Sequence, residues 1–282
     1  GKIRGMLEKA NVVWQIGELG KVDAGGGGTV AKYIASLDVD VVDLGVPVLS
    51  MHAPYEVVSK LDVYMCYRAM YESRSWNRKG LIIWMSHSCW PSMVWQTYDY
   101  YFEPTAAYFG AKKASAPIRI QWNPVSEQVE VVNNNAMDQS GLKAEAMIVN
   151  YDGKVVYQTS ADLDSKEDTT TPVCALVFDS PELSEVYYIK LRLTQGGRLL
   201  ADNFYCLGKE DGNLNQIHSL PKVKVDAATS VKRNGDEWEA NVQLKNNTDV
   251  PALMIRLKVY GKKTGERILP AYYSDNYISL LP

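Results

Sequence analysis

A change in hydrophobic pattern divides this sequence between residues 72 and 117. Before the change, "NVVWQIGEL" and "VDVVDLGVPVL" predict strands, whereas "TVAKYIASLD" and "PYEVVSKLDVYMCYRAMYE" predict helices. This alternation is typical of an α/β fold with a parallel sheet. After Pro117 the helical pattern ends and short alternating strands replace it. We therefore expect an α/β fragment followed by an all-β region.

The all-β region contains two rounds of strand pattern. In residues 117–208, Asp-Gly at 152–153 and Gly-Gly at 196–197 predict hairpin turns, and Asn-Gly at 234–235 does the same in residues 222–282. This spacing predicts tandem immunoglobulin-like β-sandwiches. The second round has about 60 residues where such a sandwich usually needs about 100, so we expect it to be truncated.

Charge and composition exclude some partner classes. Lys and Arg number 30 against 33 Asp and Glu, for a net charge of -3. This balance provides no basic surface for nucleic acid or an anionic membrane. We expect no membrane span, because no apolar run approaches the roughly 20 residues that a span needs, and no leader sequence is recognised. The oligomeric state stays open.

The cysteines do not fix the compartment. Cys66, Cys89, Cys174 and Cys206 lack the CxxC spacing of a zinc knuckle or redox pair, and we interpret them as buried thiols. A Cys174–Cys206 disulfide in an oxidising compartment is the alternative. The localisation is therefore left undetermined.

Two motifs in the first segment lie on either side of a predicted helix. "GGGGT", residues 25–29, precedes the helix, and His52 stands in "SMHAP". One imidazole alone does not make a metal site, since catalytic zinc needs about three protein ligands. Together, however, these motifs place residues 3–71 in close resemblance to the C-terminal end of the aspartyl aminopeptidase family of zinc metallopeptidases.

That resemblance implies a zinc cofactor if the site is complete, with His52 as the last ligand. The other metal ligands and the general base of the family are expected upstream of residue 1. Glu18, Asp23 and Asp43 match none of those motif positions, so we interpret them as ordinary polar residues.

The rest of the chain carries a second resemblance. "GLIIWMSHSCWPSMVWQTYDYYFEPTAAYFGAKKASAPIRIQWNP" is similar to the end of the catalytic barrel of glycoside hydrolase family 2, in its exo-β-glucosaminidase and β-mannosidase-like branch. The similarity runs over residues 67–282. It implies that residues 73–116 contain the last strand and helix of a (β/α)8 barrel and that no cofactor is needed. Both catalytic glutamates of the family lie on earlier barrel strands, so we expect no catalytic residue in this chain.

Aromatic residues of the barrel-like segment are the candidates for carbohydrate binding. The resemblance places Trp84 at the C-terminal end of the eighth strand, the active-site face of such barrels. Aromatic faces pack on the C–H faces of sugars, so Trp84 and Trp90 are our substrate-binding candidates; filling the gap between barrel and sandwich is the alternative. We assign Trp95 and Trp122 to packing.

The histidines and the acidic residue of this region have ordinary structural explanations. We interpret His87 as a loop histidine with satisfied hydrogen bonds and Asp99 as resembling a helix N-cap. His218 is expected at the surface.

The two resemblances overlap on "YRAMYE", residues 67–72. We therefore interpret the chain as a chimera, with an aminopeptidase-like tail over residues 1–72. Its expected function is that of the C-terminal portion of a family 2 β-glycosidase that lacks both catalytic glutamates and binds carbohydrate weakly. A zinc aminopeptidase remnant and a non-catalytic β-sandwich module are the alternatives. Alone, the chain is expected to be inactive.

The resemblance to metallopeptidases yields a prediction about zinc. Because His52 provides one ligand where tight sites have three or four, isothermal titration at neutral pH should detect no zinc site of micromolar affinity that depends on this residue. A micromolar site in the parent chain that disappears in His52→Ala would contradict this prediction and support a metallopeptidase role.

Overall fold

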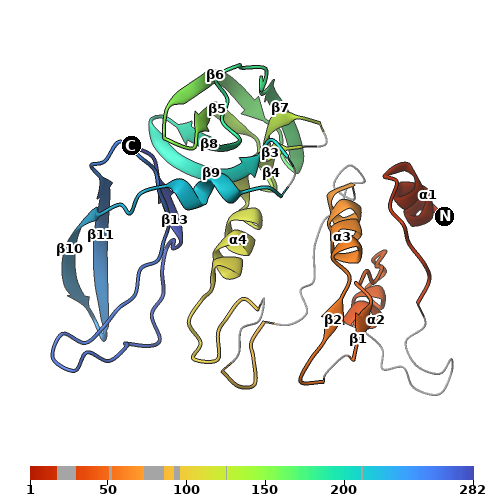
Figure 1. Ribbon diagram of the computed structural model, residues 1–282, viewed down its shortest axis with the longest axis horizontal. Helices are drawn as coiled ribbons and strands as arrows, with labels where there is room; N and C mark the ends of the chain where they lie inside the picture. The colour runs from red at the N-terminus through yellow and green to blue at the C-terminus, as the bar shows by residue number, and fades with distance from the viewer. Residues whose placement is uncertain (18–29, 51–52, 73–85, 92–95, 125, 211) are drawn as a thin grey trace. The chain divides into compact units, whose positions relative to one another are not determined.

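The computed structural model describes residues 1–282 apart from 18–29, 51–52, 73–85, 92–95, 125 and 211. The chain forms two compact units, Gly1–Trp84 and Met85–Pro282. Figure 1 follows both along the chain. Within the described residues, no helix combines the length and hydropathy needed to cross a membrane.

The first unit has a small core. It contains helices α1 (Lys2–Lys9), α2 (Val30–Ala35) and α3 (Lys60–Glu72), and strands β1 (Val48–Leu49) and β2 (Val57–Val58). Met6 and Leu7 of α1 pack with Val12 and with Ala69 of α3. The Arg68 guanidinium adds a hydrogen bond to the Ala10 carbonyl oxygen at 2.6 Å. These contacts join α1 to α3 within the unit.

The parallel sheet expected in this unit is not formed by its described residues. β1 and β2 pair antiparallel over two residues each, and residues 12–17 form no strand. Buried parallel strands need apolar cover on both faces, yet Val13 is 78% and Ile16 68% exposed. The predicted strand at 39–49 is likewise reduced to its last two residues. The predicted helix that ends at Glu72 is confirmed from Lys60 onward.

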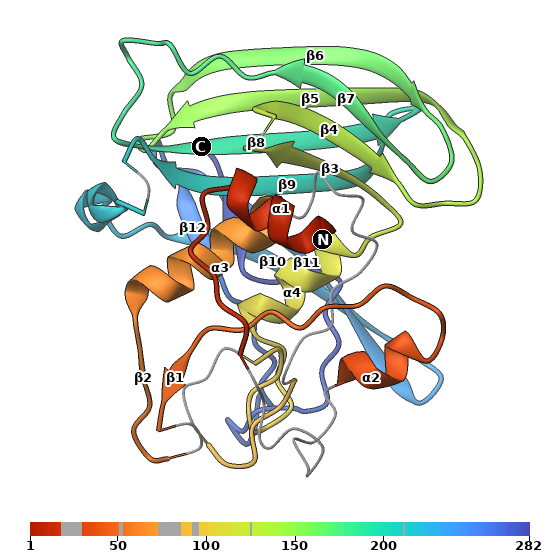
Figure 2. The ribbon, with the colours of Figure 1, turned by 90° about the vertical axis from the view of Figure 1, so that its right-hand side faces the viewer.

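The first regular elements of the second unit are α4 and the strands of the first sandwich. α4 (Ala106–Ala114) confirms the helix predicted before Pro117. One sheet has the order β3-β4-β7 and the other β6-β5-β8-β9, and all their pairings are antiparallel. Figure 2 shows these strands side by side. The strands are β3 (Ile118–Asn123), β4 (Gln128–Asn133), β5 (Gln139–Asn150), β6 (Val155–Ser165), β7 (Thr169–Ala175), β8 (Val186–Gln195) and β9 (Arg198–Gly208).

Both sheets contribute apolar side chains to one core. Ile120, Val129 and Val131 come from the three-stranded sheet, and Ile148 and Ile189 from the four-stranded one, all at most 1% exposed. Burying each such side chain is worth about 1.5–3 kcal/mol. This core makes residues 118–208 an antiparallel sandwich, and the fold class predicted from the sequence is confirmed.

The predicted turns and packing roles are also found in this sandwich. Gly153 closes β5 to β6 with φ +95°, and Gly196 and Gly197 close β8 to β9 with φ +55° and +82°, a region that favours glycine. Trp122 packs against the core with Phe178 and Tyr205, as expected. All four cysteines are free thiols, so the Cys174–Cys206 alternative is not realised. The interpretation of all four as buried thiols is corrected, because Cys89 is exposed and the other three are only partly buried.

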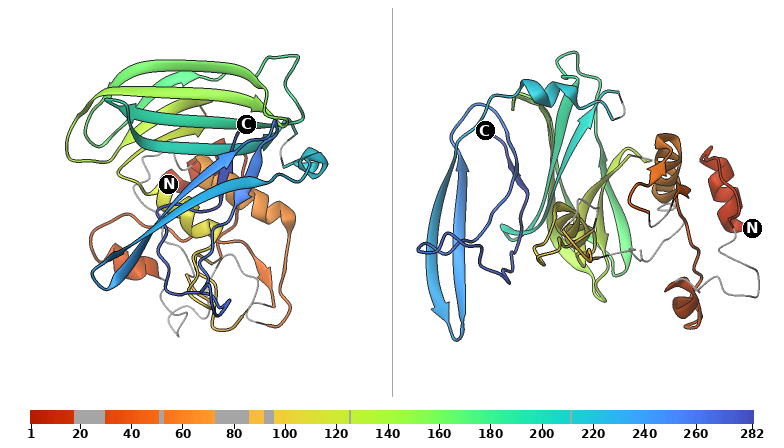
Figure 3. Two further views of the ribbon diagram at one scale, coloured as in Figure 1. Left: turned by 90° about the vertical axis from the view of Figure 1, so that its left-hand side faces the viewer. Right: turned by 60° about the horizontal axis from the view of Figure 1, so that its bottom comes forward.

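The remaining residues form two small antiparallel sheets. A 3-10 helix, η2 (Asn215–Ser219), holds the exposed His218 and leads to β10 (Val225–Asn234). β10 pairs with β11 (Glu237–Asn246) in the hairpin predicted around Gly235, and Figure 3 shows it as a long ribbon. β12 (Ala252–Ile255) pairs with β13 (Ile278–Leu280). The connection between these two strands, residues 256–277, is called the β12–β13 connection below.

The difference in core size predicts how fragments behave. Residues 117–208 expressed alone should show a β-type circular dichroism spectrum and one cooperative thermal transition, because they hold the whole sandwich core. Residues 1–72 alone should show no cooperative transition, since their core consists of a few side chains. Limited proteolysis of the full chain that digests the sandwich and spares residues 1–72 would contradict this expectation.

Candidate functional site

Exposed aromatic side chains gather in the segment that precedes α4. We call residues 86–91 and 96–105 the aromatic loop, in which Trp90 is 68%, Tyr101 52% and Phe102 67% exposed. Large aromatic side chains at such exposure are candidates for binding, because their burial by a ligand is favourable. Trp90 is therefore presented to solvent, whereas Trp84 and His52 lie outside the described residues.

Asp99 shapes the turn that displays the rings of Tyr101 and Phe102. Its Oδ1 accepts hydrogen bonds from the backbone N–H groups of Tyr101 and Glu103, both at 2.9 Å. The Asp99 carbonyl accepts from the N–H of Phe102, a residue with φ +60°. An aspartate that binds the backbone two residues ahead is a common turn former. The N-cap interpretation of Asp99 is thus corrected, since Thr105 occupies the N-cap of α4.

His87 contacts the same turn through its ring and through Nε2. Its ring stacks on Phe102 with centroids 4.2 Å apart, and Nε2 lies 3.2 Å from the Tyr100 carbonyl oxygen. A histidine held by stacking and a backbone oxygen has a structural role, as expected from the sequence.

Glu103 is a buried carboxylate at the end of the loop. Its side chain is 2% exposed, and Oε2 lies 2.8 Å from Arg256 Nη2 and also pairs with Arg267 Nη1. Burying a lone carboxylate would be costly, but two guanidinium groups offset the lost hydration. Both arginines belong to the β12–β13 connection. The loop is therefore anchored to residues more than 150 positions later in the chain.

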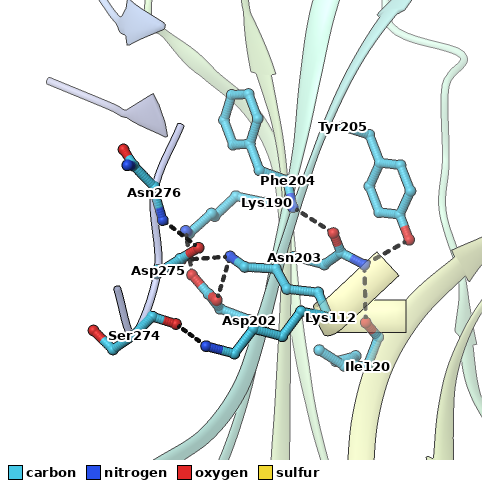
Figure 4. A network of polar contacts seen from close by, with 11 residues as sticks. Lys112, Ile120, Lys190, Asp202, Asn203, Phe204, Tyr205, Ser274, Asp275 and Asn276 are labelled. Atoms are coloured by element: carbon cyan, nitrogen blue, oxygen red, sulfur yellow. Dashed lines mark hydrogen bonds and ion pairs between the residues drawn. The ribbon is translucent and has the colours of Figure 1, made fainter. Parts of the chain in front are cut away.

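A second polar cluster lies at the other end of α4, whose last turn carries Lys112 and Lys113. Lys113 Nζ lies 3.2 Å from Asp202 on β9 and 2.9 Å from Asp275. Lys190 Nζ reaches the other oxygen of Asp202 at 3.0 Å. Lys112 donates to the carbonyl oxygen of Tyr273 and to that of Ser274, the bond drawn in Figure 4. This cluster joins α4, the first sandwich and the β12–β13 connection.

Electrostatics in this cluster favour the charged forms. Burial lowers the pKa of Lys113, but the bonds and charges of Asp275 and Asp202 outweigh burial and raise that pKa above its ordinary value. Burial likewise raises the pKa of Asp202, yet Lys190 and Lys113 outweigh it and lower that pKa. Each group therefore stabilises the ionised state of its neighbours.

Neither polar cluster could be recognised in the sequence. Glu103 and Arg267 are 164 positions apart, and Lys113 and Asp202 are 89 apart. A short-range motif cannot reveal such pairs. Among the described residues, no group of three or more His, Cys, Asp or Glu side chains could hold a metal ion.

Family models match three parts of the chain. Residues 1–73 match the aminopeptidase I zinc metalloprotease (M18) family, residues 128–209 the mannosidase Ig/CBM-like domain, and residues 203–282 the exo-β-D-glucosaminidase Ig-fold domain. The two resemblances inferred from the sequence are thus confirmed.

Individual relatives divide the chain in the same way. An exo-β-D-glucosaminidase of Arthroderma benhamiae is 30% identical over 78% of this chain and 26% of its own length. A probable M18 family aminopeptidase 1 of Thermotoga neapolitana is 50% identical over 24% of this chain and 15% of its own length. This chain therefore spans about a quarter of the glucosaminidases it matches.

Solved structures support the second resemblance. The exo-chitosanase of Amycolatopsis orientalis is 27% identical with a TM-score of 0.67, over 79% of this chain and 30% of that one. A β-D-mannosidase of Dictyoglomus thermophilum, 21% identical over 79% of this chain and 26% of that one, shares the fold with a TM-score of 0.53.

The Lys113–Asp202 pair yields a prediction about stability. In urea unfolding at pH 7, the cycle of Lys113→Met, Asp202→Asn and the double variant should give a coupling free energy of about 1 kcal/mol. The magnitude is modest because the Lys113 side chain is 36% exposed to screening solvent. The cross-strand pair Lys232–Glu239, more exposed at 70% and 54%, is the control and should couple less.

The direction of the pKa shifts sets the pH window for this coupling. Asp202 has a depressed pKa, so its contribution is present above the unfolded value of about 3.9 and is lost as pH falls through the folded value. Lys113 has a raised pKa, so its contribution is present below about pH 10.4 and is lost as pH rises through the folded value. A coupling that is unchanged at pH 2.5 would contradict the assignment.

Proposed function

Because the chain is a chimera of a segment similar to M18 aminopeptidases and a longer segment similar to exo-β-D-glucosaminidases, we propose that its function resides in the longer segment. That function is carbohydrate binding by the C-terminal portion of a family 2 β-glycosidase. The aromatic loop is the binding surface and Trp90 is its main contact, while Trp84, outside the described residues, stays a candidate from the sequence alone.

The exposure of the loop aromatics is the observation that carries this proposal. Trp90, Tyr101 and Phe102 each leave more than half of the side chain exposed, and Asp99 fixes the backbone that carries Tyr101 and Phe102. Sugar rings offer apolar C–H faces, and a rigid aromatic face binds them with little loss of conformational entropy. A fixed turn that displays aromatic rings therefore supports carbohydrate as the ligand class.

We propose further that the chain does not catalyse glycoside hydrolysis alone. Retaining glycosidases need two carboxyl groups about 5–5.5 Å apart, one as acid/base and one as nucleophile. The buried carboxylate of the loop, Glu103, is engaged by two arginines and is not free to attack a sugar or protonate a leaving group. The resemblance implies that both glutamates of the family lie on barrel strands earlier than the one expected in residues 73–116.

The aminopeptidase-like segment supports one alternative. Its 50% identity to the Thermotoga neapolitana relative favours a zinc aminopeptidase remnant built on His52. A single candidate ligand cannot activate water, which makes this the weaker proposal. A β-sandwich module without any ligand is the other alternative, and the binding measurement below distinguishes it.

Carbohydrate binding is tested by calorimetric titration with glucosamine oligomers. The parent chain should bind with a dissociation constant in the roughly millimolar range, and Trp90→Ala should weaken binding about tenfold, or about 1.4 kcal/mol. Trp238→Ala is the matched control, because Trp238 on β11 is similarly exposed at 71% but lies outside the loop. Equal losses in the two variants, or no binding by the parent, would contradict the proposal.

Turnover is tested with p-nitrophenyl β-D-glucosaminide and the corresponding β-D-mannoside. Release of nitrophenol should not exceed background, since binding without differential stabilisation of the transition state does not accelerate the reaction. Glu18→Gln is measured in parallel. Turnover in the parent that disappears in this variant would contradict the absence of a catalytic pair.

A further inference from the structure

We propose that the β12–β13 connection is a two-point clasp that positions the aromatic loop for carbohydrate binding. One point is Glu103, held by Arg256 and Arg267, and the other is Lys113, held by Asp275. The positioning role rests on the function proposed above, whereas the clasp itself can be measured without any sugar.

The first point fixes the base of the aromatic loop. Glu103 is nearly inaccessible to water, so removal of an arginine leaves a buried charge with half its compensation. Arg267 also reaches the turn itself. Its Nη1 lies 3.8 Å from Asp99 Oδ2, and its guanidinium lies over the Tyr101 ring at 5.5 Å. One side chain of the connection thus contacts the turn aspartate, a displayed aromatic ring and the buried carboxylate.

The second point fixes the far end of α4. Lys113 pairs with Asp275, and Lys112 donates to the backbone oxygen of Tyr273 at 3.1 Å. Lys112 also donates to the backbone oxygen of Ser274 at 2.7 Å (Figure 4). Cations in the last turn also complement the helix dipole. Because Lys113 is shared with Asp202 of β9, the connection and the first sandwich hold the same lysine.

Aromatic packing fills the space between the two points. Phe109 in the middle of α4 is 3% exposed, and its ring lies 6.4 Å from that of Tyr273 and 6.1 Å from that of Tyr277. A helix of nine residues is roughly 14 Å long. The connection therefore contacts the middle and the last turn of α4, and also Glu103 in the segment that leads into this helix.

Asn276 joins the two points within the connection. Its Oδ1 accepts the N–H of Leu257 at 2.7 Å, and its Nδ2 donates to the Leu257 carbonyl oxygen at 3.0 Å. Arg256 and Asp275, the neighbours of this pair, therefore belong to one hydrogen-bonded crossing of the chain. Loss of one point should consequently loosen the other, which a set of independent surface ion pairs would not do.

Hydrogen exchange of the full chain measures the clasp. Arg267→Met should increase amide exchange in residues 96–105 at least about tenfold, and it should also increase exchange in α4, at a distance from the substituted residue. Asp275→Asn should also increase exchange in both segments, with the larger increase in α4 and the smaller one in residues 96–105. Lys154→Met is the matched control, because the Lys154–Glu182 pair at 2.6 Å is exposed on the first sandwich and should change neither segment.

A conservative variant separates a positioning role of Arg267 from a general loss of folded structure. Arg267→Lys keeps the charge but loses the planar fork, so exchange in the loop should be intermediate between the parent and Arg267→Met. Each variant is compared only while its far-ultraviolet circular dichroism matches that of the parent. Unchanged loop exchange in both Arg267 variants would overturn the clasp.

Titration with glucosamine oligomers tests what the clasp does. Arg267→Met should weaken binding about tenfold, with Arg267→Lys between it and the parent, although Arg267 needs no contact with the sugar. Increased loop exchange with unchanged affinity would overturn the positioning role. Absence of binding by the parent would overturn the proposed function and the positioning role together, while the exchange result would still decide whether the clasp exists.

Discussion

The apolar interior between the two sheets of the first sandwich fixes the strand to which the end of α4 is bound. Ile148 and Ile189 are completely buried there, opposite Val129 and Val131. This burial fixes β9, and β9 presents Asp202 to the end of α4. The polar cluster around Lys113 and Asp202 is consequently built on a packed sheet. Individually weak ion pairs can therefore hold a defined geometry there.

Burial distinguishes the two clusters that flank α4. Glu103 has exchanged nearly all of its hydration for two guanidinium groups, whereas Lys113 remains about one third exposed. Loss of a partner therefore costs more at Glu103, and added salt weakens the Lys113 side more. The buried Glu103 contact therefore contributes most to holding the β12–β13 connection, and the more exposed Lys113 contact contributes less.

The two segments of the chimera differ in how much of their apolar side-chain surface they bury. The first sandwich buries its alternating strands completely, but in the first unit Val13, Ile16 and Leu49 remain largely exposed. The same contrast explains why the predicted turns of the sandwich are found and the predicted parallel sheet is not. Strand formation in an α/β layer depends on helices and strands that cover both faces, not on the apolar run alone.

The local features of this protein follow from its sequence alone. Glycines at 153, 196–197 and 235 specify hairpins through their backbone freedom, alternating apolar residues specify the sandwich strands, and short motifs reveal two unrelated resemblances. Only the tertiary structure brought Glu103 to Arg267 and Lys113 to Asp275. The physical reason is that these contacts join residues more than 150 positions apart, and no periodicity or local propensity encodes which distant charges meet once the sheets have packed.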